Sequence, residues 1–184
     1  MSRVTILSAL ALYTLAAPVL AAEMPATPYA GQQARTIKAL SNEEIVALRN
    51  GEGMGMAKPA ELNGYPGPVH VLTLAAKLGL TDNQHRQVTT IFERMSAAAK
   101  SLGAELIAHE QTLDQLFAKG EITLDRLTAE TAAIAELQGR LRLVHLGAHL
   151  ETRALLNPDQ IARYEELRGY GQPEAPAQHH HHNG

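Results

Sequence analysis

The 184-residue chain has no cysteine and no tryptophan, and its Phe and Tyr residues number only two and five. Without cysteine it can form neither a disulfide nor a thiolate metal site. The apolar content is mainly Ala and Leu, which suits thin helix-on-helix packing better than a thick aromatic core. The composition therefore favours a helical protein held together without covalent links.

Several function classes lack their sequence signatures. The formal net charge is −3 at pH 7, with no basic stripe of the kind that nucleic-acid binding requires. No Ser nucleophile stands in a recognisable elbow, and His109-Glu110 lacks the second histidine of a zincin helix because position 113 is Leu. The hydrophobic pattern gives no strand signal. We expect an all-α protein that is not an enzyme and does not bind nucleic acid.

The first 22 residues have the composition of a cleavable secretory signal. Arg3 supplies a positive charge, residues 4–20 are apolar, and Ala21 or Ala22 offers a small residue for cleavage. The alternative is a retained anchor, but this run is interrupted and short for a membrane span of ~20 residues. After cleavage no second apolar run would be long enough to cross a bilayer. We expect localisation in a bacterial periplasm, without stable membrane insertion.

Glycine and proline divide the rest of the chain into helical segments. Residues 23–67 combine a Pro/Ala-rich lead, a short helix that a capping box of Ser41 and Glu44 should open, and a stretch punctuated by glycine and proline, and are predicted to be flexible. Residues 82–118 and 123–156 carry apolar side chains three or four positions apart, which predicts two long amphipathic helices. Because only about four residues join them, they should form an antiparallel hairpin with shorter flanking helices.

The predicted organisation has four parts: a signal (1–22), the flexible segment (23–67), a helical hairpin domain (68–170) and a disordered His-rich tail (171–184). A two-helix hairpin buries only one stripe of each helix, so apolar surface should remain. That surface should meet a second copy of the chain or another protein. We expect a homodimer.

Two five-residue motifs mark predicted helix starts. Residues 80–84 read Leu-Thr-Asp-Asn-Gln, and residues 156–160 read Leu-Asn-Pro-Asp-Gln. In each, the Thr or Asn side chain can accept a hydrogen bond from the first turn, and the Gln can reach back to the cap's own amide. The residues of these capping motifs are Leu80, Thr81, Gln84, Leu156, Asn157 and Gln160.

This pair of motifs in a small exported helical chain resembles the LTxxQ family of periplasmic stress proteins. That family comprises Spy/CpxP chaperone-like proteins and CnrX/ZraP-type heavy-metal-responsive relatives. The first motif matches in full, the second has Asn157 in place of Thr, and the resemblance covers residues 68–170. It implies an all-helical, often dimeric periplasmic protein without catalytic activity, whose members handle unfolded protein, metal ions or both.

His145 and His149 are the first candidate metal ligands. They stand four residues apart, which places both rings on one face of a helix. The expected hairpin register brings Met95 and Glu93 opposite them. A carboxylate suits zinc, nickel or cobalt, and a thioether suits copper(I). The alternative is that both histidines are partly buried polar residues beside the helix seam.

The other histidines have different expected roles. His179, His180, His181 and His182 form a run that could capture zinc, copper or nickel transiently, unless the run is a purification tag. His109 is expected to be a satisfied interior imidazole, and His70 and His85 to be structural or on the surface.

Two functions of different classes remain open. The first is a periplasmic stress-response binding protein of Spy/CpxP type, which would hold unfolded clients or a membrane sensor protein without ATP and without a required cofactor. The alternative is a periplasmic sensor or buffer of a heavy metal, one of Zn, Cu, Ni or Co. A structural dimer that binds neither client nor metal is a third reading.

Overall fold

The computed structural model describes residues 27–170. The expected signal (1–22) and the His-rich tail (171–184), with His179 to His182, lie outside the described residues. Residues 27–30 form a turn, closed by a 3.0 Å hydrogen bond from the Ala30 amide to the Thr27 carbonyl oxygen, and belong to a unit of their own. From residue 31 onward the described chain is one compact unit of helices, and no strand occurs between residues 27 and 170. The all-α prediction is confirmed.

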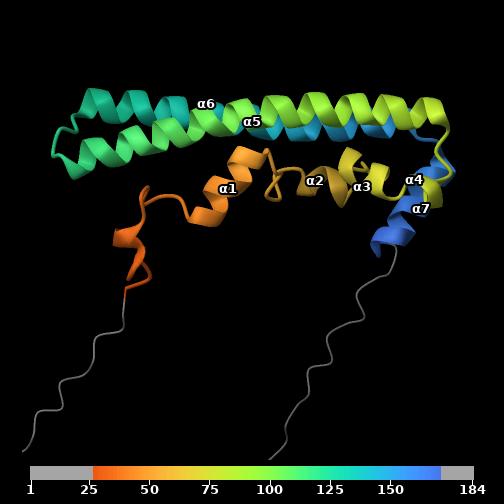
Figure 1. Ribbon diagram of the computed structural model, residues 1–184, viewed down its shortest axis with the longest axis horizontal. Helices are drawn as coiled ribbons and strands as arrows, with labels where there is room; N and C mark the ends of the chain where they lie inside the picture. Colours follow the sequence, from red (N-terminus) through yellow and green to blue (C-terminus); the bar gives the residue numbers. More distant parts are fainter. Residues whose placement is uncertain (1–26, 171–184) are drawn as a thin grey trace, which may run out of the picture. The chain divides into compact units, whose positions relative to one another are not determined.

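Two long helices dominate this unit (Figure 1). In chain order its helices are η1 (Gln32–Ala34), α1 (Asn42–Asn50), α2 (Lys58–Glu61), α3 (Pro68–Thr73), α4 (Ala75–Leu78), α5 (Asp82–Ala118), α6 (Leu124–Leu155) and α7 (Pro158–Arg168). Residues 119–123 join α5 to α6, and the two helices lie side by side. Side-chain contacts link them at two places, an ion pair between Arg94 and Glu151 and a 2.7 Å contact between His109 and Glu130.

The helix starts follow the capping chemistry that the sequence predicts. Thr81, Asn157 and Ser41 each cap a helix in a complete capping box, the last with Glu44 as its partner. The sequence predicts one helix from Pro68 to Leu78, but this segment divides into α3 and α4 at Leu74. Just before that break, the Thr73 hydroxyl donates a 2.9 Å hydrogen bond to the Val69 carbonyl, a bond that often accompanies helix bends.

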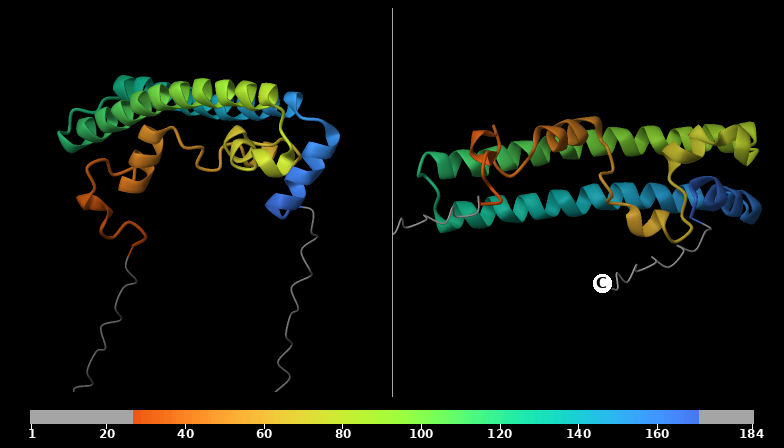
Figure 2. Two further views of the ribbon diagram at one scale, coloured as in Figure 1. Left: turned by 45° about the vertical axis from the view of Figure 1, so that its right-hand side comes forward. Right: turned by 90° about the horizontal axis from the view of Figure 1, so that it is seen from below.

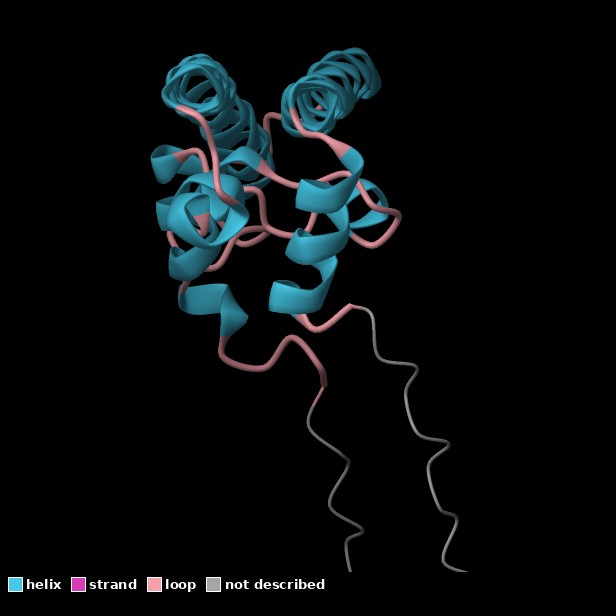
Figure 3. Ribbon diagram, turned by 90° about the vertical axis from the view of Figure 1, so that its right-hand side faces the viewer, coloured by secondary structure: helices cyan, strands magenta, loops and turns pink. Residues whose placement is uncertain are grey.

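The shorter helices gather on one side of the long pair (Figures 2 and 3). Helix α1 packs on α5, α2 packs on α6, and α3 contacts both, so the chain crosses the pair before α5 begins. The predicted domain boundary at residue 67 falls inside this compact unit. Residues 31–67 cover the long helices because their apolar side chains are buried there, among them Ile37 and Leu48.

Three apolar clusters hold the unit together. One joins α1 to the middle of α5 and α6, and one joins α3, α4 and α7 to the start of α5. Between them lies a smaller cluster of Ile91, Met95 and Ala148. The backbones of α1 and α5 come very close at Gly103 of α5, where an added Cβ atom would lie 2.3 Å from the Leu48 carbonyl oxygen. Within residues 27–170, no helix combines the length and apolar character needed to cross a membrane.

Candidate functional site

A cavity of about 700 Å³ lies where residues 50–70 cover the middle of α5 and α6. The long helices contribute Phe92, Met95, Ser96, His145 and His149 to its wall. The covering segment contributes Glu61 and His70 and the glycine-rich run around Met54. Its size falls within the range usual for small-ligand sites.

His149 is buried, and its tautomer can be assigned. Its Nδ1 atom lies 2.7 Å from the Tyr65 carbonyl oxygen, and because a carbonyl can only accept, Nδ1 carries the proton. The Nε2 atom is therefore the acceptor of this ring. A Cβ at Gly67 would lie 3.0 Å from this atom, so only glycine lets the chain pass so close to it.

His145 is 4% exposed and lacks the backbone partner that His149 has. Its Nε2 atom is buried without a hydrogen-bond partner among the described residues. Burial lowers the pKa of His145 because it disfavours the charged ring, and the neighbouring His149 lowers that pKa further. The ring is therefore neutral at pH 7, which is the form that binds metal ions.

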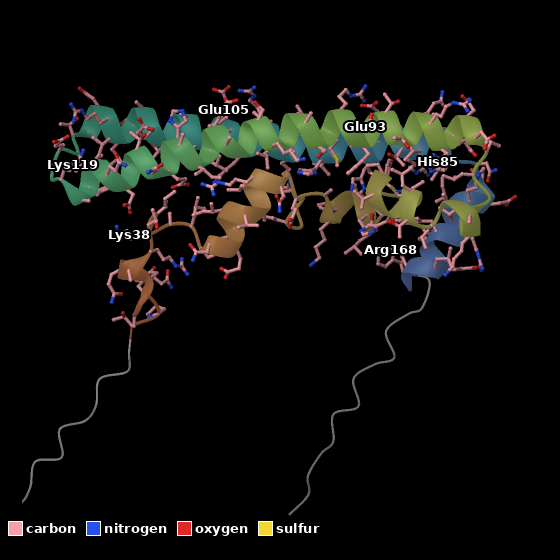
Figure 4. The ribbon with its side chains drawn as sticks, viewed as in Figure 1. Lys38, His85, Glu93, Glu105, Lys119 and Arg168 are labelled. Carbon is pink, nitrogen blue, oxygen red and sulfur yellow. The ribbon has the colours of Figure 1, made fainter. Side chains whose placement is uncertain are left out.

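Four metal ligands were predicted outside the C-terminal tail, and the structure brings three of them together. Met95 is buried and lines the cavity with His145 and His149. Glu93 is exposed and does not line the cavity (Figure 4). Two residues turn an α-helix by about 200°, so Glu93 and Met95 cannot face the same neighbour.

Glu61 is the carboxylate that sequence reasoning missed. Its Oε2 atom lies 3.7 Å from His149 Nδ1 and accepts a 3.2 Å hydrogen bond from the Gly67 amide. Its Oε1 atom accepts hydrogen bonds from the C-terminal part of the described chain: from Tyr164 at 2.6 Å, Tyr170 at 3.0 Å and Arg168 at 3.2 Å.

These contacts set the charge of Glu61. Burial alone would raise the pKa of its carboxyl group, but hydrogen bonds from Tyr164 and Tyr170 and the nearby His149 and Arg168 outweigh burial and lower it. The same carboxylate contributes to raising the pKa of Tyr164, after the larger effect of burial. The charged Glu61 carboxylate thus connects the cavity wall to α7.

His70 and His85 were expected to be structural or on the surface, and His109 to be a satisfied interior imidazole. His70 instead lines the cavity, and its pKa is lowered by burial and by Arg168. His85 is exposed on α5. His109 Nδ1 lies 2.7 Å from a Glu130 carboxylate oxygen, so it has a partner on α6, but its side chain is 41% exposed and the expected interior position is wrong. No periodicity in residues 50–70 could have predicted that Met54, Glu61 and His70 would share one cavity.

The side chains that line the cavity offer imidazole, thioether and carboxylate groups as possible donors. Two buried imidazoles, His145 and His149, share one wall, and Met95 stands on the facing wall. Between residues 27 and 170, no three His, Asp or Glu side chains converge as closely as a metal ion would need. Protein-family models, curated proteins and solved structures were compared with the chain, and none matches it.

Proposed function

We propose that this protein binds a transition-metal ion in the cavity, with His145 and His149 as the first ligands, and acts as a periplasmic sensor or buffer of that metal. The observation that carries the proposal is the pair of buried histidines facing one cavity, one of them without a partner for Nε2 among the described residues. A buried polar group left unsatisfied costs about 1–3 kcal/mol. A bound ion would remove that cost.

The tautomer of His149 also supports metal binding. Its Nδ1–H is held by the Tyr65 carbonyl, which fixes the ring and leaves Nε2 as a donor atom for an ion. Ligating histidines commonly have such a second hydrogen bond, because it orients the ring and raises its basicity. Here the bond comes from the segment that covers the cavity, so ion binding and closure of this segment would be linked.

The scaffold of this proposal is the predicted hairpin. We infer that α5 and α6 form a rigid helical hairpin, that residues 31–78 cover one face of it, and that two such chains associate as a homodimer. Apolar side chains that the compact unit leaves exposed support association, among them Leu124 at 76% and Leu143 at 69% exposure. A membrane sensor protein is a second partner that would fit a metal-responsive role.

The same exposed side chains support a second candidate function. They would allow weak, ATP-independent binding of unfolded clients, as in Spy/CpxP-type proteins. Light scattering of a denatured client tests this: suppression of aggregation at an equimolar ratio is expected, and no suppression would remove the chaperone-like function. Metal binding is preferred because the cavity donors are specific, whereas exposed leucines are common.

The metal proposal is tested by titration of Zn(II), Ni(II) and Cu(II) in a chain whose four tail histidines are replaced by serine. We expect at least one ion to bind with a Kd tighter than about 10 µM, which corresponds to about −7 kcal/mol. His145→Phe and His149→Phe should each abolish this binding. His85→Phe, an exposed histidine on α5, is the matched control and should leave it unchanged. Binding weaker than this limit, or equal losses in all three variants, would refute the proposal.

A further inference from the structure

We infer that the cavity is built for monovalent copper, held by the thioethers of Met54 and Met95 together with His145, and that the turn carrying Met54 closes over the ion. This inference rests on the proposed metal-binding function and names the ion and an additional ligand. Met54 does not follow from helical periodicity, since it lies in the glycine-rich run between α1 and α2.

Met54 has a backbone conformation that needs an explanation. Its φ is +42°, in the left-handed region, and it is the one non-glycine residue with positive φ among residues 27–170. Such a conformation costs roughly 1–2 kcal/mol and persists only where the surroundings impose it. Glycines flank it on both sides, and a 2.7 Å hydrogen bond from the Met56 amide to the Gly53 carbonyl closes the turn around it. Strain of this kind at a cavity mouth indicates a functional position.

The contacts of the turn place Met54 near the other two ligands. At its start, a Cβ on Gly51 would lie 3.0 Å from the Ser96 carbonyl oxygen, and Ser96 directly follows Met95. Two residues later, a Cβ on Gly53 would lie 3.5 Å from His145 Nδ1. The backbone therefore passes from the Met95 wall to the imidazole of His145 immediately before it reaches Met54.

The exposure of Met54 agrees with a role in capture. Its side chain lines the cavity and is nevertheless 44% exposed, so it stands at the mouth, whereas Met95 is buried. Methionine is flexible and polarisable, so Met54 can take the ion at the surface and bring it to the inner ligands. His149, through Nε2, is available as a fourth donor.

The ligand chemistry favours copper(I) over harder ions. Thioethers are soft donors that select Cu(I), whereas zinc in proteins takes thiolate, imidazole and carboxylate. Two carboxylates line the cavity, Glu52 and Glu61. Glu52 is exposed and accepts a hydrogen bond from the Asn50 side chain. The oxygens of Glu61 already accept hydrogen bonds from two tyrosines, Arg168 and a backbone amide. A hard ion that recruited Glu61 would have to break this network, and a soft ion held by Met54 and Met95 would not.

The test is competition for Cu(I) against the chelator bathocuproine disulfonate, without oxygen, in the full chain with the tail histidines replaced by serine. Met54→Leu and Met95→Leu should each weaken Cu(I) binding at least about tenfold, or about 1.4 kcal/mol. Zn(II) affinity should stay the same in both variants. Met56→Leu is the matched control: Met56 lies two residues from Met54, does not line the cavity, and should leave Cu(I) binding unchanged.

The outcomes separate this inference from the proposed function. Unchanged Cu(I) affinity in both Met variants, or an equal loss in Met56→Leu, overturns the copper assignment while Zn(II) binding through His145 would still stand. Equal losses of Cu(I) and Zn(II) also overturn it. If His145→Phe alters binding of neither ion, the proposed function itself fails. X-ray absorption at the copper edge gives a second measure: sulfur scattering is expected, and a shell of nitrogen and oxygen alone contradicts the inference.

Discussion

The side-chain amide of Gln84 donates a 2.8 Å hydrogen bond to Gln160 Oε1, and that of Gln160 donates one of 3.1 Å back to Gln84 Oε1. These two glutamines are 76 residues apart, and each also completes the capping box of its own helix. Gln84 further donates a 2.8 Å bond to the Leu155 carbonyl at the end of α6. The two capping motifs therefore bind each other and connect the start of α5 to the start of α7.

We predict that Gln160→Ala lowers the free energy of unfolding by about 1–3 kcal/mol, since it removes both hydrogen bonds with Gln84 and the bond that Gln160 accepts from the Asn157 amide. Gln160 is itself only 7% exposed. A double-mutant cycle with Gln84→Ala should show a coupling energy above about 0.5 kcal/mol. Glu44→Ala in the exposed local box of α1 is the control and should cost less than about 1 kcal/mol. Chemical denaturation measures the free energy of unfolding of each variant. Additive losses in the double variant would show that Gln84 and Gln160 do not stabilise each other.

Gly103→Ala should destabilise the protein even though alanine is the better helix former. The substitution gains up to about 1 kcal/mol of helix propensity. However, the new Cβ would lie 2.3 Å from the Leu48 carbonyl oxygen, so α1 must move away from α5. Overpacking of this kind costs about 1–3 kcal/mol.

The matched control for this substitution is Gly139→Ala, at an interior position of α6 where an added Cβ would meet no atom within 4 Å. It should raise the free energy of unfolding, by up to about 1 kcal/mol. Thermal unfolding followed by circular dichroism compares the two. If both substitutions stabilise the protein, α1 does not pack against α5 at Gly103.

Tyr164→Phe should cost about 1.5–3 kcal/mol, the usual contribution of a hydrogen bond to a charged group. The hydroxyl of this fully buried tyrosine donates the 2.6 Å bond to Glu61. Tyr65→Phe is the control, because the ring of Tyr65 packs under Arg153 and no hydrogen bond is formed by its hydroxyl within the described part of the chain. Its unfolding midpoint in urea should stay close to that of the unmodified protein. Equal shifts of the midpoint in Tyr164→Phe and Tyr65→Phe would show that the hydrogen bond from Tyr164 to Glu61 does not stabilise the fold.

The stability of the metal-free protein should fall as the pH drops below about 6.5, the ordinary value for histidine. The pKa of His145 is lowered in the folded state, so the unfolded chain binds a proton first as the pH falls. Stability is therefore fully present above about pH 6.5 and is lost towards the lower pKa of the folded state. Urea titrations between about pH 5 and 8 measure the slope.

His145→Phe should reduce this slope, and His70 should account for part of what remains because its pKa is lowered too. His85→Phe, on the exposed surface of α5, should keep the slope of the unmodified protein. A slope that is the same with and without His145 would contradict a buried neutral imidazole.

Local chemistry allowed much of the fold to be predicted from the sequence. The capping residues Thr81, Asn157 and Ser41 begin helices where expected, because a side-chain cap and the amides it satisfies lie within four residues of each other. The expected hairpin register also predicted that Met95 and His145 would share one site, and both line the cavity. The same register failed for Glu93, because an error of two residues rotates a side chain to the other face of the helix.

The long helices, their capped starts and the histidine pair on α6 follow from the sequence, because they depend on interactions between residues close together in the chain. The contact of Glu61 with Tyr164, that of Gln84 with Gln160, and the position of Met54 at the cavity depend on long-range packing instead. Glu61 and Met54 reach these positions because a glycine- and proline-rich segment without periodicity folds back on α5 and α6. Its path is set by the apolar surface it covers and by close backbone approaches at glycine, which no local pattern encodes.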